Sequence, residues 1–132
     1  MAEILELEIV TPERQLVRDQ VSGVQLPGKD GEMGILPGHA PLLSQLGAGA
    51  LRYTAAGRQH WMAVDGGFVE ILEDHVRVLA DSAEKAEDID LGKAQADLQR
   101  AQEQVAHATD AAAAMAAVNR AQARVDAAGQ KG

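Results

Sequence analysis

The 132-residue sequence contains no cysteine, which excludes disulfides and thiolate-bound metal sites. Aromatic residues are nearly absent, with one Trp, one Tyr and one Phe, and the formal net charge is -8. A nucleic-acid binder needs positive charge and benefits from stacking aromatics, so this class is disfavoured. No apolar run approaches the length of a membrane span, and the chain starts acidic at Met1-Ala2-Glu3 instead of with a basic and apolar leader. We therefore expect a soluble, cytosolic chain.

Catalytic motifs are also missing. The glycines lack the spacing of dinucleotide or phosphate loops, and no Gly-Lys-Ser/Thr sequence occurs. The histidines are scattered, and no pair lies within one helix turn, so we predict no metal site: His39, His60, His75 and His107. A serine nucleophile with a histidine base can assemble from distant residues, but the sequence has no nucleophile elbow. We predict no catalytic residue.

The composition changes near residue 80. All four prolines, all three aromatic residues and ten of the thirteen glycines precede this point. The last 53 residues contain eighteen alanines. The change predicts two domains, residues 1–84 and 85–132.

The first part has the period-two hydrophobicity of half-buried strands. Leu5, Leu7 and Ile9 alternate with glutamates, and turn signals such as Pro27-Gly28-Lys29-Asp30 and Gly66-Gly67 separate short strands. This pattern is typical of an antiparallel β-sandwich or barrel. The predicted core residues are Ile4, Leu5, Leu7, Ile9, Leu16, Val24, Leu26, Leu51, Trp61, Val64, Phe68, Ile71, Val76 and Val78.

The second part has helical periodicity. Two apolar stripes follow steps of three and four residues: Leu91, Ala94, Leu98, Ala101, Val105 and Ala108, then Ala114, Val118, Ala121, Val125 and Ala128. The link His107-Ala108-Thr109-Asp110 offers N-cap residues, which predicts an antiparallel α-helical hairpin after the sandwich. Because the link lacks Gly and Pro, one continuous helix is the alternative.

The helical stripes consist mainly of alanine, which forms helices well but offers little apolar area for docking. Such a hairpin could leave its docked position at small cost and act as a mobile regulatory element. A permanently docked hairpin is the alternative. The last helix is basic on an otherwise acidic chain, because Arg120, Arg124 and Lys131 outnumber Asp126.

Residues 31–42, Gly-Glu-Met-Gly-Ile-Leu-Pro-Gly-His-Ala-Pro-Leu, combine apolar side chains with glycines and prolines. These backbone breakers predict irregular backbone at Met33, Ile35, Leu36 and Leu42. A rigid apolar loop is suited to docking a partner. The alternative is that these side chains cover the core beneath them.

Three stretches occur in the order and spacing found in one protein family: residues 31–42, Ala63 to Glu70 and Ala83 to Asp90. Together they resemble the bacterial epsilon subunit of the rotary F-type ATP synthase, and the resemblance covers nearly the whole chain. The expected order of sandwich and alanine-rich hairpin agrees with that family's architecture.

The resemblance implies a non-catalytic rotor subunit that couples proton transport to ATP synthesis, with the active sites on other chains. It implies a peripheral location on the cytoplasmic face of the bacterial plasma membrane. The sandwich would contact the gamma subunit and the c-ring through Glu32, Met33, Gly34, Ile35 and His39. The hairpin would inhibit ATP hydrolysis by extending toward the alpha and beta subunits, with Arg120, Arg124 and Lys131 facing acidic surface.

Some members of that family bind regulatory ATP through an Ile/Leu-Asp-x-x-Arg-Ala motif and two helical arginines. The corresponding ATP-site residues are Glu84, Ile89, Asp90, Lys93, Arg120 and Arg124. No cofactor is required, and ATP would be regulatory. Lys93 replaces the motif's arginine and offers a point charge instead of a planar fork, so ATP affinity should fall or vanish. In the alternative interpretation, Asp90 caps the helix, Lys93 is solvated and the arginines pair with carboxylates of the first helix.

Two functions of other classes are alternatives. One is a sandwich-plus-helix adaptor unrelated to rotation, which would co-purify with something other than gamma. The other is a small hydrolase that uses His39 with an acidic partner, which would turn over substrate as an isolated chain.

Overall fold

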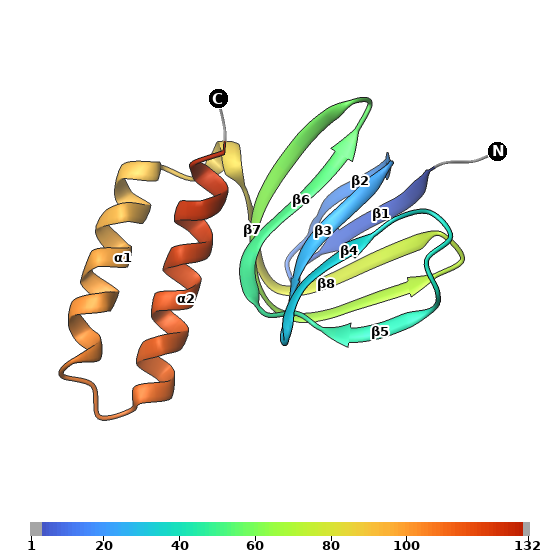
Figure 1. The fold of residues 1–132 in the computed structure, drawn as a ribbon. Helices are drawn as coiled ribbons and strands as arrows, with labels where there is room; N and C mark the ends of the chain where they lie inside the picture. Colours follow the sequence, from blue (N-terminus) through green and yellow to red (C-terminus); the bar gives the residue numbers. More distant parts are fainter. Residues whose placement is uncertain (1–3, 131–132) are drawn as a thin grey trace.

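The computed structural model describes residues 4–130, which form a strand-rich domain followed by two helices (Figure 1). This arrangement confirms the predicted fold class. The elements are β1 (Leu5–Val10), β2 (Gln15–Val21), β3 (Gly23–Gly28), β4 (Gly31–Ile35), β5 (Leu42–Gln45), β6 (Ala48–Ala55), β7 (Arg58–Leu72), β8 (His75–Lys85), the 3-10 turn η1 (Ala86–Asp88), α1 (Leu91–Val105) and α2 (Ala111–Ala128).

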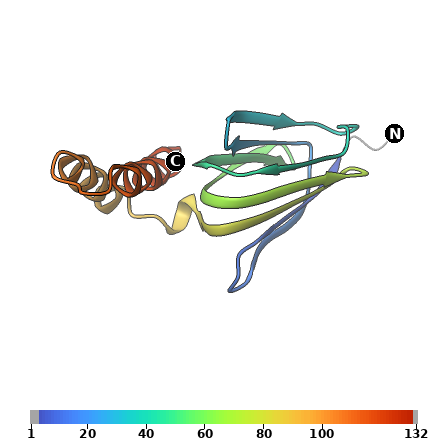
Figure 2. The ribbon, with the colours of Figure 1, turned by 90° about the horizontal axis from the view of Figure 1, so that it is seen from below.

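The strands form one sheet in the order β2-β1-β8-β7-β6-β3-β4, and β5 also pairs with β7. The sheet folds over itself into two layers, and the hairpin continues from one end of the sandwich (Figure 2). Neighbouring strands are antiparallel except β1 and β8, which are parallel. The N-terminal strand therefore lies between β2, at the edge of the sheet, and the last strand, β8.

Gly66 and Gly67 lie inside β7 and do not form the turn that the sequence predicted. Both have positive φ, at 70° and 107°, and a Cβ on Gly67 would lie 2.0 Å from the Leu79 carbonyl oxygen. The glycines allow β7 to bend, so that its first part pairs with β6 and its last part with β5. One long strand thus belongs to both layers.

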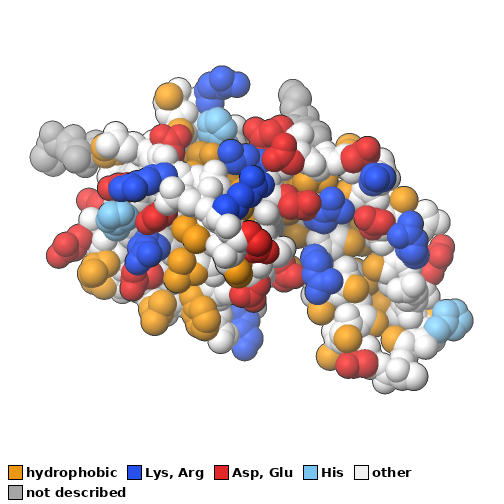
Figure 3. Space-filling view, turned by 180° about the vertical axis from the view of Figure 1, so that it is seen from behind, with side chains coloured by type: hydrophobic (Ala, Val, Ile, Leu, Met, Phe, Trp, Pro, Cys, Tyr) orange, Lys and Arg blue, Asp and Glu red, His pale blue; other side chains and the backbone are white. Residues whose placement is uncertain are grey.

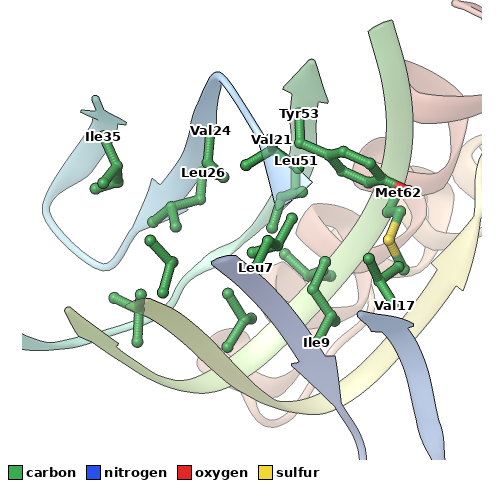
Figure 4. Packing of buried hydrophobic residues seen from close by; sticks show 14 of the residues in the cluster. Leu7, Ile9, Val17, Val21, Val24, Leu26, Ile35, Leu51, Tyr53 and Met62 are labelled. Carbon is green, nitrogen blue, oxygen red and sulfur yellow. The ribbon is translucent and has the colours of Figure 1, made fainter. Parts of the chain in front are cut away.

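The main core lies between the two layers (Figure 4). Most predicted core residues are buried there, but Ile4 and Phe68 are 41% and 48% exposed and those two predictions are wrong. Phe68 alternates with the buried Val69 and Ile71, which directs it to the outer face of the sheet. Leu16 and Trp61 are only partly buried. The Arg52 guanidinium lies 5.3 Å from the Trp61 ring centroid, a cation–π contact on the outer surface.

The helical part is an antiparallel hairpin and not one continuous helix (Figure 1). Asp90 and Asp110 cap α1 and α2, and each carboxylate accepts a hydrogen bond from the backbone N–H three residues later, at 3.0 Å. Asp110 has extended backbone, with φ -113°, which interrupts the helix before α2 begins. The caps explain why a link without glycine or proline still forms a turn.

Helix α2 packs against β6 and β7, and α1 lies on the outer side of α2 (Figure 1). The interface is a second, smaller cluster of buried residues: Ala63, Ile89, Ala94, Ala123, Ala127 and Ala128. The two predicted stripes contribute Ala94, Ala121 and Ala128 as buried residues, while Ala108 lies outside both helices. The hairpin therefore docks mainly through methyl groups.

Candidate functional site

The predicted contact segment, residues 31–42, is not an irregular loop throughout. Met33 and Ile35 lie on β4 and Leu42 begins β5, so the prediction of irregular backbone is wrong for these three residues. Strand β4 is at the edge of the sheet. Only the connection between β4 and β5, residues 36–41, is irregular.

Ile35 is 1% exposed and belongs to the main core, so it cannot contact a partner without unfolding the sandwich. Met33 is partly buried and packs on the same core. Glu32 and Gly34 are exposed, and His39 is half-buried with Nδ1 2.7 Å from the Ala40 carbonyl oxygen. Of the five predicted contact residues on the sandwich, Ile35 alone is inaccessible.

The accessible residues of this segment lie at opposite ends of the sandwich. Glu32 lines a hollow of about 550 Å³ together with Trp61 and with Asp126 of α2, at the end nearest the hairpin. The connection after β4 lies at the far end (Figure 1), where the Gly38 N–H donates to Asp74 Oδ1 at 2.7 Å. The segment therefore runs the length of the sandwich and offers two separate contact points.

The outer face of the sheet carries an exposed apolar group that was not predicted from the sequence. We call it the outer apolar patch: Leu43, Phe68 and Leu79. Phe68 is the direct cross-strand neighbour of Leu79, and Leu43 pairs with Glu70, two residues from Phe68. The three side chains are 70%, 48% and 44% exposed. Figure 3 shows hydrophobic side chains gathered on the sandwich away from the hairpin. The alternation of Phe68 with Val69 and Ile71 was a signal that could have revealed the patch.

A charged row borders the outer apolar patch on the same sheet face. Arg77 lies 3.5 Å from Glu8 and 4.0 Å from Glu70, measured between guanidinium nitrogen and carboxylate oxygen. Arg77 and Glu70 face each other across β7 and β8, two register positions from Phe68 and Leu79 and therefore on the same face. The face thus combines an apolar centre with a polar rim, as protein interfaces do.

Two arginines of α2 contact the sandwich, because the docked hairpin directs their side chains toward β7 and β8. Arg120 Nε donates to Asp65 Oδ2 at 2.8 Å, and Arg124 Nε donates to Glu84 Oε2 at 2.6 Å. Arg124 Nη1 also lies 3.4 Å from Asp97 Oδ2 on α1. We call these contacts the ionic clasp. The hydrogen bond from Glu84 raises the pKa of Arg124, burial lowers it, and the charges of Glu84 and Asp97 raise it further.

The structure brings together only part of the predicted ATP site. Glu84, Arg120 and Arg124 line one cleft of about 400 Å³ between sandwich and hairpin, which contains neither Asp90 nor Lys93. Asp90 is the α1 cap, and Ile89 is 1% exposed in the second cluster. The alternative to an ATP site, in which these residues have structural roles, is thus correct for Asp90 as the helix cap and for the contact of Arg124 with a carboxylate of the first helix, Asp97.

A second hollow, of about 260 Å³, lies between the two helices and brings in residues that sequence analysis did not select. It contains Arg100, Arg120 and Arg124 together with Asp97. Arg100 donates to Asp97 Oδ1 at 2.9 Å. We call this hollow between the helices the arginine groove. Lys131, predicted to contact a partner, lies outside the described residues.

Within residues 4–130, no group of three His, Cys, Asp or Glu side chains is arranged to hold a metal ion. No helix in this part of the chain is both long and apolar enough to cross a membrane.

Two family models match the chain. The β-sandwich domain of the ATP synthase delta/epsilon chain matches residues 4–86, and the long α-helix domain of the same chain matches residues 87–129. The chain is 53% identical to the ATP synthase epsilon chain of Solibacter usitatus over 134 residues, covering 99% of this chain and 100% of the relative. It is 46% identical to the epsilon chain of Nitratidesulfovibrio vulgaris over 128 residues, covering 95% and 96%.

A solved structure has the same fold. The chain superposes on a chain in the cryo-EM structure of the Euglena gracilis mitochondrial ATP synthase, OSCP/F1/c-ring, with TM-score 0.82 and 22% identity. The superposition covers 97% of this chain and 82% of the other. At this identity the likeness concerns the fold.

Proposed function

Because the chain belongs to the ATP synthase delta/epsilon-chain family, we propose that it is a non-catalytic rotor subunit of the central stalk, which couples proton transport to ATP synthesis on other chains. The full-length similarity to epsilon chains, across both sandwich and helices, is the observation that carries this proposal. The subunit is peripheral, on the cytoplasmic face of the bacterial plasma membrane. Residues 1–84 form the docking domain and residues 85–132 the regulatory one.

The gamma subunit covers the outer apolar patch in this proposal. Three large apolar side chains on a regular sheet face are costly in water, and a permanent partner removes them from it. Glu32, Met33, Gly34 and His39 supply the remaining contacts to gamma and the c-ring from the two ends of β4.

The test is assembly of the full chain with gamma and the c-ring of its own enzyme. Leu43→Asp with Phe68→Asp should abolish assembly, because burying two unpaired charges at an apolar interface is costly. Circular dichroism should be unchanged, since both side chains are already exposed. Met115→Asp, which charges an exposed apolar side chain on the hairpin, is the matched control and should assemble normally. Normal assembly of the double variant would remove the patch from the interface.

The hairpin inhibits ATP hydrolysis when it extends toward the alpha and beta subunits. Its small, methyl-rich interface with the sandwich supports this role, because little apolar area must be exposed for it to leave. Arg120, Arg124 and Lys131 then contact acidic surface on those subunits. Deleting residues 89–132 in the assembled enzyme should raise ATP hydrolysis. Unchanged hydrolysis would show that the hairpin does not inhibit.

Binding of regulatory ATP is the second candidate function, and the arginine groove favours it. Arg100 and Arg120 are 63% and 54% exposed and can still offer guanidinium N–H groups to phosphate. Of the other predicted ATP-site residues, Glu84 on β8 holds Arg124 beside the groove, and Ile89, Asp90 and Lys93 lie at and before the start of α1. Titration calorimetry with ATP should detect binding that Arg100→Ala and Arg120→Ala each weaken and that Lys93→Arg strengthens. Absence of heat from both the parent and Lys93→Arg would refute an ATP site.

A further inference from the structure

The ionic clasp joins the two domains at adjacent points. Arg120 and Arg124 are one helical turn apart on α2, and Asp65 and Glu84 lie on the neighbouring strands β7 and β8. Each guanidinium therefore meets its own carboxylate across the domain boundary. Arg124 is only 27% exposed and contacts both oxygens of Glu84, Oε2 at 2.6 Å and Oε1 at 3.4 Å.

The apolar contacts that also hold the hairpin on the sandwich come mostly from small side chains. The buried residues of the interface cluster are five alanines and Ile89, and Leu91 and Val125 are partly buried against them. Ile89 belongs to the linker before α1, so α2 itself contributes three buried alanines and the partly buried Val125. Two partly buried ion pairs are then a substantial share of what fixes α2 to the sandwich.

We propose that Asp65 and Glu84 act as built-in acidic ligands of Arg120 and Arg124, so that the hairpin docks without nucleotide and is released as ionic strength rises. The two carboxylates accept the guanidinium hydrogen bonds that an external anion or an acidic protein surface would otherwise accept. Undocking therefore exchanges one set of acidic partners for another, and it leaves no arginine buried without a counter-charge.

The clasp is partly exposed, which makes salt a sensitive test. The Arg120 and Asp65 side chains are 54% and 31% exposed, and Glu84 is 42% exposed. Raising ionic strength from about 0.05 M to about 0.5 M shortens the screening length to below about 5 Å and weakens exposed pairs. The alanine contacts do not weaken with salt. Salt therefore separates the ionic contribution to docking from the apolar one.

The experiment is hydrogen exchange on the isolated full chain, which measures opening of α2 even when the open state is rare. Amides of β1 serve as the internal reference for the sandwich. Without ATP and at low salt, the amides of residues 121–128 should be protected, and high salt should accelerate their exchange relative to β1. Addition of ATP should not be needed for this protection.

Charge-removing variants identify the ligands. Glu84→Gln should accelerate α2 exchange about tenfold and Asp65→Asn about threefold, and both should reduce the effect of salt. Glu87→Gln, which removes an exposed carboxylate of η1, is the matched control and should leave α2 exchange unchanged. If Glu84→Gln also accelerates exchange in β1, Arg124→Gln replaces it and breaks the same pair from the helix.

Two results would overturn the proposal. One is protection of α2 that appears only when ATP is added. The other is α2 exchange that stays unchanged in Asp65→Asn, in Glu84→Gln and at high salt, which would reduce the clasp to surface pairs without effect. Because the measurement involves neither gamma nor the c-ring, it is independent of the proposed rotor function.

Discussion

A chain that ends at Asp88 should fold into the sandwich alone. The truncation removes both helices and Ile89 but keeps β1 to β8 and η1. The main core is left intact, because all nineteen of its buried residues lie between Leu5 and Ala80. We therefore expect the sandwich to fold independently, because the hairpin covers its surface and adds no residue to its main core.

The expected loss of stability is small. The sandwich re-exposes mainly the methyl groups of Ala50 and Ala63, at about 0.8 kcal/mol each, together with part of η1. The main core, at about 1.5 to 3 kcal/mol for each large side chain, contributes far more. We expect the free energy of unfolding to fall by about 1 to 3 kcal/mol and Tm to fall by about 5 to 15 °C.

The assay is urea and thermal denaturation followed by circular dichroism, with the full chain as control. The truncated chain should keep a β-rich spectrum and a single cooperative transition. A gradual, non-cooperative transition would refute the reasoning, because it would mean that the helices complete the core of the sandwich. A loss much above about 3 kcal/mol would contradict the area argument.

Three further changes test other parts of the fold. Ile35→Asp should unfold the sandwich, because it buries an unpaired charge, whereas Leu36→Asp, at a side chain that is 66% exposed, should leave circular dichroism unchanged; equal behaviour would contradict the assigned burial. Gly67→Ala should lower the free energy of unfolding in urea by more than about 2 kcal/mol, since its Cβ would overlap the Leu79 carbonyl oxygen. Burial and the charges of Asp19 and Glu87 raise the pKa of Tyr53. Folded Tyr53 therefore keeps its proton at a pH where the unfolded chain has lost it, and the free energy of unfolding should fall as pH rises above about 10. An ordinary Tyr53 pKa in an ultraviolet titration would refute this.

The sequence by itself determined the local structure. Period-two alternation predicted the strands, and helical periodicity with Asp110 as a cap predicted the hairpin, because side-chain direction and capping depend on residues close in the chain. The composition change near residue 80 likewise predicted a strand-rich part followed by a helical part.

Tertiary structure decided which face each strand buries. Alternation shows that Phe68 and Ile71 point to opposite faces, but only the packing of the two layers makes one face core and the other surface. For the same reason, Ile35 proved to be core although its neighbours suggested a contact loop. The bend at Gly66 and Gly67 also depends on pairing with two different strands.

The ionic clasp could not be predicted from the sequence for a related reason. Arg120 and Asp65 are 55 residues apart, and Arg124 and Glu84 are 40 apart. The spacing of the arginines on α2 was visible, but their partners depend on how the helix lies across β7 and β8. Local periodicity fixes which side chains share a face, and only the packing of that face against another element fixes which charges meet.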